Sequence, residues 1–226
     1  MKTVLISGGT GLVGTRLSQK LKEKGYQVNI LSRSKKNDSE FKTFFWDVNK
    51  NFIDPEAIET ANYIIHLAGD NIAEKRWTDE RKKEILDSRV KSGDLLFNAV
   101  KSIPNQLKAF ISASAVGYYG AITTQHIFSE SDPYHDDFLG KTCAIWEASA
   151  NQFETLGIRT VLIRTGVVLS KEGGALAKLK IPVQFGIGSA LGIGDQYVPW
   201  IHLDDLCDIY IKAIEDSQMI GAYNAI

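Results

Sequence analysis

The sequence has little cysteine, no long apolar run and no excess of charge of either sign. Cys143 and Cys207 are the only cysteines among 226 residues and form no Cys-x-x-Cys pair, so the sequence predicts neither a disulfide framework nor a metal site. No apolar run approaches the roughly 20 residues of a bilayer-spanning helix, so no membrane partner is expected. A net charge of −1 argues against a nucleic-acid partner. Together these absences predict a cytoplasmic protein.

Short apolar runs alternate with amphipathic segments along most of the chain. Strands are predicted over residues 2–7, 26–31, 43–46, 63–67, 109–113 and 160–164, and helices from residue 11 and over residues 79–101 and 138–156. Strands that alternate with helices form a parallel sheet covered on both faces. The fold class predicted is therefore α/β, a doubly wound, Rossmann-like parallel sheet.

The composition of the sequence changes after Gly166, because six glycines fall within residues 173–194. We expect loops there, with a short helix over residues 175–180, and a strand at 223–226. Residues 1–165 are predicted to bind the cofactor. Residues 166–226 are predicted to form part of a small, substrate-facing subdomain that lacks a further C-terminal segment.

A glycine-rich loop follows the first predicted strand. Its residues are Gly8, Gly9, Thr10, Gly11, Leu12, Val13 and Gly14, and they fit both G-x-G-x-x-G and G-x-x-G-x-x-G. In this motif the glycines allow a tight turn, a close approach of pyrophosphate and close packing of helix on strand. The helix N-terminus then directs its N–H groups at the phosphates. Strand, loop and helix in this order predict dinucleotide binding.

The end of the second predicted strand selects between the two nicotinamide cofactors. NAD enzymes carry an acidic residue there, which binds the ribose 2′-hydroxyl. This chain has Ser32 and Arg33 followed by Lys35 and Lys36, and no acid before Asp38. Arg33 is suited to pair with a 2′-phosphate and Ser32 to donate to it. The cofactor predicted is therefore NADP(H).

Several motifs together resemble a known family. His66-Leu67-Ala68-Gly69 and Ser112-Ala113-Ser114 resemble the extended short-chain dehydrogenases/reductases. Within that family, an atypical branch described as sugar-nucleotide-epimerase-like is similar over the whole chain. The stretches concerned are Arg76-Trp77-Thr78, Asp87-Ser88-Arg89, Trp146-Glu147-Ala148, residues 164–169, Pro199-Trp200-Ile201-His202 and Asp204-Asp205-Leu206.

The resemblance implies further cofactor contacts. Leu67, Ala68 and Gly69 would lie on the adenosine and ribose side, and Val167 would flank the nicotinamide. Arg89, with Glu84 on the same predicted helix, would lie beside the cofactor. For Glu84 and Arg89 a surface ion pair is an equal alternative.

The resemblance also implies catalytic residues, and here the chain departs from the family. The family uses a serine or threonine, which Ser114 matches, and a Tyr-x-x-x-Lys pair whose tyrosine transfers the proton. This pair is absent from the sequence, and its positions fall on Leu139 and Cys143. Tyr118, Tyr119, Lys141 and His202 are alternative proton carriers.

Two hypotheses follow. The first is an NADP(H)-dependent oxidoreductase or epimerase that acts on a small polar molecule such as a nucleotide sugar, with Ser114 polarising the substrate oxygen. The second is a non-catalytic NADP(H)-binding sensor or scaffold, because fold alone does not fix function. In either case a homodimer is an alternative to a monomer.

Overall fold

An eight-stranded sheet forms the centre of the protein. The computed structural model describes residues 1–34, 40–190 and 193–226, and the strands follow the order β10-β7-β6-β5-β1-β2-β3-β4. Neighbouring strands are parallel except β3 and β4. The strands are β1 (Thr3–Ser7), β2 (Gln27–Ser32), β3 (Lys42–Asp47), β4 (Phe52–Ile53), β5 (Tyr63–His66), β6 (Ala109–Ala115), β7 (Arg159–Thr165) and β10 (Gly221–Ala225). The predicted doubly wound α/β fold is confirmed.

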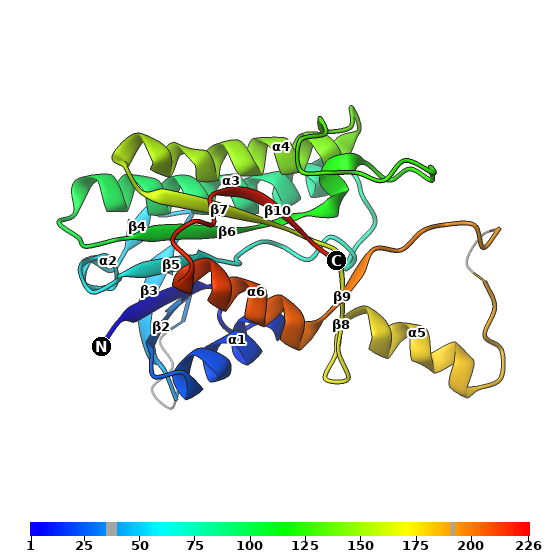
Figure 1. The fold of residues 1–226 in the computed structure, drawn as a ribbon, viewed down its shortest axis with the longest axis horizontal. Helices are drawn as coiled ribbons and strands as arrows, with labels where there is room; N and C mark the ends of the chain where they lie inside the picture. Colours follow the sequence, from blue (N-terminus) through cyan, green and yellow to red (C-terminus); the bar gives the residue numbers. More distant parts are fainter. Residues whose placement is uncertain (35–39, 191–192) are drawn as a thin grey trace.

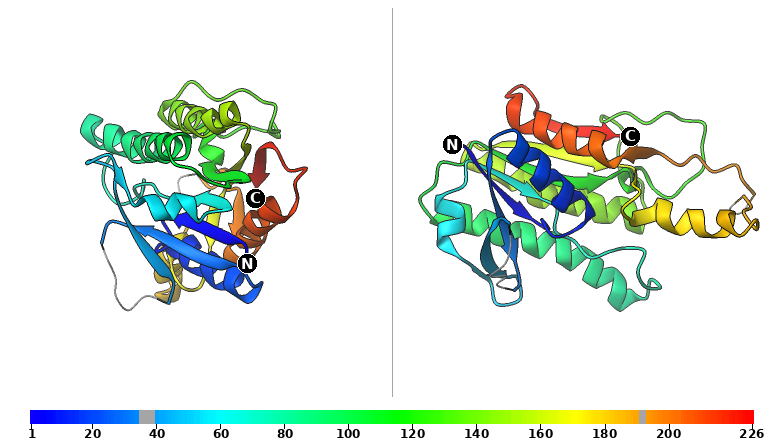
Figure 2. Two further views of the ribbon diagram at one scale, coloured as in Figure 1. Left: turned by 90° about the vertical axis from the view of Figure 1, so that its left-hand side faces the viewer. Right: turned by 90° about the horizontal axis from the view of Figure 1, so that it is seen from below.

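Helices cover both faces of this sheet (Figures 1 and 2). α1 (Leu12–Glu23) and α6 (Leu203–Glu215) lie on one face, and α2 (Pro55–Glu59), α3 (Asp79–Ser102) and α4 (Phe138–Asn151) on the other. Successive side chains of a strand point to opposite faces. Ile6 of β1 therefore packs in the core that contains Leu206 of α6, while Leu5 packs in the core that contains Phe153. Because both faces are buried, the middle of β1 is the uninterrupted apolar run Val4-Leu5-Ile6.

Local sequence signals fix the ends of the two long helices. Thr78 caps α3 by accepting the N–H of Arg81 at 3.2 Å, so the helix begins at Asp79, the predicted first residue. The predicted 138–156 helix is α-helical only to Asn151. It continues as a 3₁₀ turn, η2 (Gln152–Leu156), and stops at Gly157, whose φ of 73° is left-handed. A second 3₁₀ turn, η1 (Val116–Tyr119), follows β6.

The chain after Gly166 has two parts. β8 (Val167–Leu169) and β9 (Trp200–His202) form a small parallel sheet, and α5 (Gly174–Gln184) is a longer form of the predicted short helix. No residue of α5 is buried, and Figure 1 shows it extending away from the main sheet. After β9 the chain returns to the body of the protein, where α6 packs on α1 and β10 completes the sheet. The predicted boundary at residue 166 thus falls between β7 and β8.

Both edges of the sheet are short or partly covered. At one edge β4 has only two residues and runs antiparallel to β3. At the other edge, the backbone N–H of Asn224 in β10 donates to the Glu130 carboxylate at 2.8 Å. Within the part of the chain that the structure describes, no helix is both long and apolar enough to cross a bilayer.

Candidate functional site

A cavity opens where the order of the sheet reverses. β1 lies between β5 and β2, and open α/β sheets bind ligands outside the carboxyl ends of strands at such a point. The cavity has a volume of about 270 Å³. Its lining consists of Gly8, Gly11, Leu12, Val13, Gly14, Leu67, Ala113, Ser114, Thr165, Val168, Leu206 and Tyr210. The glycine loop and Ser114, which are 100 residues apart in the sequence, therefore share one cavity.

The glycine loop has the geometry of a cradle. Gly8 has a φ of 74°, which favours glycine. A Cβ on Gly14 would lie 2.6 Å from the Cα of Gly9, so only glycine fits there. α1 then begins at Leu12 with Gly11 as its N-cap, and no side chain caps it. The unpaired N–H groups of a helix's first turn form an anion site, so this loop fits the pyrophosphate of a dinucleotide.

The residues predicted to select the cofactor lie at the end of β2. Ser32 is half-buried, and its hydroxyl accepts the N–H of Ser34 at 3.2 Å. Arg33 is exposed and is therefore accessible to a ligand phosphate. Lys35, Lys36 and Asp38 fall outside the described residues.

The segment after β5 lies against α3. Leu67 lines the cavity, and Ala68 is half-buried beside it. The Arg89 guanidinium donates to the carbonyl of Asp70 at 3.0 Å and lies over the Trp146 ring at 5.0 Å. Burial lowers the pKa of Arg89 from its ordinary value. A Cβ on Gly69 would lie 3.2 Å from the Arg89 side chain, so Arg89 packs closely under this loop.

Two other predicted cofactor residues do not line the cavity. Glu84 is exposed and pairs at 2.8 Å with an arginine whose side chain is only 8% exposed. Its partner there is Arg81 rather than Arg89. Val167 donates its backbone N–H to the carbonyl of Pro199 at 2.8 Å, while the neighbouring Val168 lines the cavity.

The two dyad positions face the η1 turn. A Cβ on Gly117 would lie 3.5 Å from Leu139 and 3.8 Å from the Cys143 sulfur. Burial raises the pKa of the Cys143 thiol to about 12, so it stays neutral at physiological pH. Lys141 is exposed and forms an ion pair with Asp136 at 2.6 Å. On this part of α4, therefore, no cationic side chain takes the place of the family's lysine.

Ser114 belongs to a buried polar network. Its hydroxyl donates to Glu147 Oε1 at 2.6 Å. Arg164 donates to the same carboxylate through Nε at 2.8 Å and Nη2 at 2.9 Å, and through Nη1 to the Tyr119 hydroxyl at 2.8 Å. Burial opposes the charge of Arg164, but these hydrogen bonds outweigh it and raise its pKa. The network joins β6, α4 and β7 directly behind the cavity.

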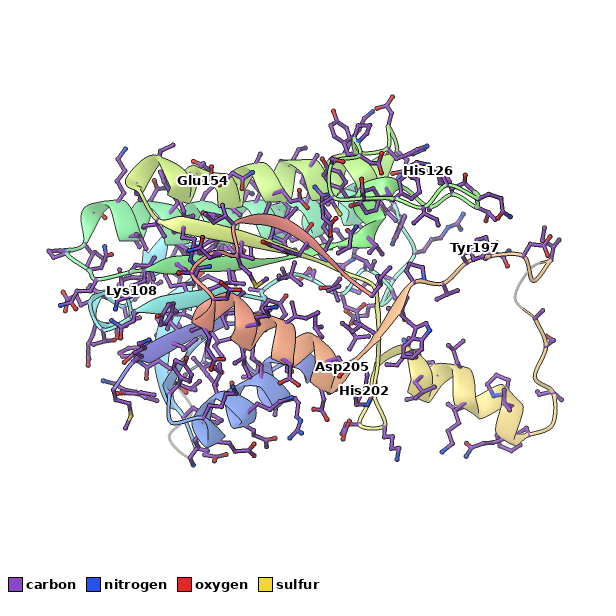
Figure 3. All side chains as sticks on the ribbon, in the orientation of Figure 1. Lys108, His126, Glu154, Tyr197, His202 and Asp205 are labelled. Atoms are coloured by element: carbon purple, nitrogen blue, oxygen red, sulfur yellow. The ribbon has the colours of Figure 1, made fainter. Side chains whose placement is uncertain are left out.

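The cavity lining includes neither of the other two predicted catalytic residues. Tyr118 is half-buried, and its ring stacks on the Arg164 guanidinium at 3.5 Å. His202 is exposed and caps α6 by accepting the N–H of Asp204 at 3.2 Å. Figure 3 shows His202 and Asp205 together where β9 meets α6. His202 lines a second, more polar groove of about 830 Å³ with Thr10 and Arg16, so the structure does not bring it together with Ser114.

A second buried network supports the glycine loop. His66 Nδ1 lies 2.6 Å from the Ser7 hydroxyl, and Nε2 lies 3.2 Å from the Ser92 hydroxyl. The Ser92 hydroxyl itself donates to the carbonyl of Ser88 at 2.7 Å, so it accepts from Nε2. Burial lowers the pKa of His66 to about 4. The neutral ring thus links α3 to Ser7, the residue before the glycine loop.

Sequence reasoning gave no role to Glu147 and Arg164, although both stand in stretches that carry the resemblance, and it named Tyr119 only as an alternative proton carrier. The register of the sheet is the signal that would have identified this network, because Ser114 in β6 pairs with Arg164 in β7. Charged residues within apolar strands are rare unless they are paired, so Arg164 in β7 already called for a buried acid.

Comparison with known proteins gives a consistent match. The model of the NAD-dependent epimerase/dehydratase family matches residues 4–225. An epimerase family protein of Staphylococcus aureus is 36% identical over 227 residues, which cover 99% of this chain and 74% of the relative. A Staphylococcus haemolyticus relative with the same description is 35% identical.

Solved structures agree with this. The human epimerase family protein SDR39U1 (isoform 2), solved with NADPH, superposes with a TM-score of 0.86 at 32% identity over 99% of this chain and 74% of that one. A nucleoside-diphosphate sugar epimerase from Corynebacterium glutamicum gives a TM-score of 0.86 at 36% identity, over 99% of this chain and 46% of that one.

Proposed function

This chain belongs to the NAD-dependent epimerase/dehydratase family, and from this premise we propose that it is an NADP(H)-dependent oxidoreductase or epimerase acting on a small polar molecule. The observation that carries the proposal is the shared cavity, in which the glycine cradle and the Ser114 hydroxyl meet. When bound, a nicotinamide supplies hydride acceptance or donation. A nucleotide sugar is the substrate class to test first, because the Corynebacterium glutamicum structure is described as a nucleoside-diphosphate sugar epimerase.

Named residues of this chain hold the cofactor in the proposal. The glycine loop and the start of α1 bind the pyrophosphate, and Leu67 and Ala68 face the adenosine side. Ser32 and Arg33 bind the 2′-phosphate, which makes NADP(H) the preferred cofactor. The NADPH in the human relative's structure supports this preference. Val168, which lines the cavity with Ser114, flanks the nicotinamide end, and Val167 is its neighbour in β8.

Titration of tryptophan fluorescence with NADPH and NADH tests the cofactor. Trp146 lies under Arg89 beside the cofactor segment and serves as a reporter. We expect the wild-type chain to prefer NADPH. We expect Arg33→Ala to weaken NADPH binding by about 10-fold and to leave NADH unchanged, because only the 2′-phosphate loses its charged partner.

Lys101→Ala, which removes an exposed charge at the far end of α3, is the matched control and should bind NADPH like the wild type. Equal affinity of the wild type for NADPH and NADH would contradict the proposal that Ser32 and Arg33 select NADPH. A lack of binding by either would contradict the site itself. A panel of nucleotide sugars and small carbonyl compounds, followed through NADPH absorbance, then tests turnover.

A specific observation favours a second candidate, a non-catalytic NADP(H) sensor. Leu139 and the neutral Cys143 occupy the positions of the family's proton-transfer pair. A sensor must distinguish the two redox states, so NADPH and NADP⁺ should differ in affinity or in their effect on a partner protein. Equal binding without such an effect would exclude the sensor.

A further inference from the structure

The proton of Ser114 has a fixed direction in this structure. Glu147 receives two charge-assisted hydrogen bonds from Arg164, and both residues are almost completely buried, with exposures of 6% and 4%. A carboxylate only accepts hydrogen bonds, so the proton in the 2.6 Å bond between Ser114 and Glu147 belongs to Ser114.

The groups around Arg164 hold this arrangement in place. Its Nη1 donates to the Tyr119 hydroxyl at 2.8 Å and to the carbonyl of Glu130 at 3.1 Å. The Tyr119 hydroxyl in turn donates to Asn224 Oδ1 at 2.8 Å, or to the carbonyl of Ser129 at 3.0 Å. A carboxylate held on one side by a pinned guanidinium has no freedom to turn away from Ser114.

A serine hydroxyl has one proton and two acceptor lone pairs. The proton of Ser114 is directed to Glu147, away from any ligand, while Ser114 itself lines the cavity. What Ser114 offers to the cavity is therefore acceptor capacity. This differs from the role expected from the family, in which this serine donates to a substrate carbonyl.

We infer that Ser114 meets the ligand as a hydrogen-bond acceptor, and that the site selects a molecule presenting a hydroxyl, rather than a carbonyl, at this point. Glu147 is the positioning residue that sets this preference. The inference rests on the proposed function, because that proposal identifies the cavity as the substrate site. It narrows the substrate class to alcohols that bind in their reduced form.

A matched pair of small probes tests the inference without a known substrate. Cyclohexanol carries a hydroxyl donor, whereas cyclohexanone has the same ring with an acceptor only. Their affinities are measured by saturation-transfer NMR on the full chain, with and without saturating NADPH. The wild type should bind cyclohexanol roughly 5-fold or more tightly, because cyclohexanone would set two acceptors against each other.

Three variants assign the preference. Ser114→Ala removes the acceptor and should abolish the difference between the probes. Glu147→Gln replaces the acceptor-only carboxylate by an amide that also donates, which frees the Ser114 proton, so it should lose the preference while Ser114 is still present. Ser112→Ala is the control, because its buried hydroxyl on the same strand donates to the carbonyl of Ala113 instead, and it should keep the preference.

Equal binding of the probes by the wild type, tighter binding of cyclohexanone, or binding of neither would overturn the inference. A folded Glu147→Gln that keeps the alcohol preference would remove the positioning role of Glu147. If Glu147→Gln does not fold, the Ser114→Ala comparison decides. Failure of the proposed function gives a different result from failure of this inference. It would be seen as absent NADPH binding, whereas the affinities of the two probes can still be compared on the cofactor-free chain.

Discussion

At the scale of single residues, several of the chain's buried polar groups are connected in networks. Ser7, His66 and Ser92 form one such network, and all three are at most 1% exposed. The hydrogen bonds satisfy a neutral ring, and a proton added to Nδ1 would have to break the bond from Ser7. The fold therefore favours the uncharged form of His66.

The burial of His66 makes the free energy of unfolding depend on pH in a defined direction. The pKa of His66 falls from 6.5 to about 4 on folding, so the unfolded chain binds the extra proton between these values. Stability is lost as pH drops from about 6.5 towards 4, by up to about 3 kcal/mol. Urea unfolding at pH 7 and pH 5 measures the loss.

His66→Gln should lower stability at pH 7 and reduce its change between pH 7 and 5. His126→Gln, which alters an exposed histidine paired with Asp132, should keep the wild-type profile. An unchanged pH slope in His66→Gln would contradict the assignment.

The same scale shows what the sequence could and could not predict of the site. The glycine loop was identified because its residue types and spacing match a known chemical need, and Ser114 because it matches the serine of the family that the chain resembles. Glu147 and Arg164 were quoted as part of a resemblance but received no role, because their meeting depends on the register of β7 against β6 and on the packing of α4. Such contacts between distant segments leave no periodic signal in a single sequence.

At the scale of elements, the predicted strands and helices were found wherever apolar periodicity was strong and turns were marked. The short β4 and α2 were missed because two to five residues carry no period. α6 was missed although Leu203, Leu206, Tyr210 and Ile214 recur on one face, because the preceding glycines suggested continued loops. α5 runs through Pro182, which lacks the N–H that would bond back along the helix, and α5 ends two residues later at Gln184.

The start of α1 offers an element-level prediction. Gly14→Ala would force a Cβ against the Gly9 backbone and shift the helix from the loop. We expect a loss of about 1–3 kcal/mol in stability and at least a 10-fold loss in NADPH affinity. Thermal unfolding and fluorescence titration measure the two effects. Glu23→Ala, on the exposed end of the same helix, is the control, and NADPH binding retained by Gly14→Ala would argue against the cradle.

At the scale of the whole molecule, the sheet separates two hydrophobic cores that differ in their relation to the cavity. Leu206 belongs to the α1/α6 core and also lines the cavity, whereas Phe153 lies in the α3/α4 core away from it. Leu206→Ala and Phe153→Ala should each destabilise the protein by about 2–5 kcal/mol. Only Leu206→Ala should also weaken NADPH binding once both are compared well below their melting temperatures. An equal loss of affinity in both would show that the cores are coupled.

The two edges of the sheet have a consequence for how the protein behaves at high concentration. An open strand edge recruits further strands and starts aggregation, and natural proteins prevent this with very short or blocked edge strands. Here β4 is too short to template a neighbour, and the Glu130 carboxylate occupies a backbone N–H of β10. A homodimer, which the sequence leaves as an alternative to a monomer, is therefore expected to use helical surfaces rather than a continuous intermolecular sheet.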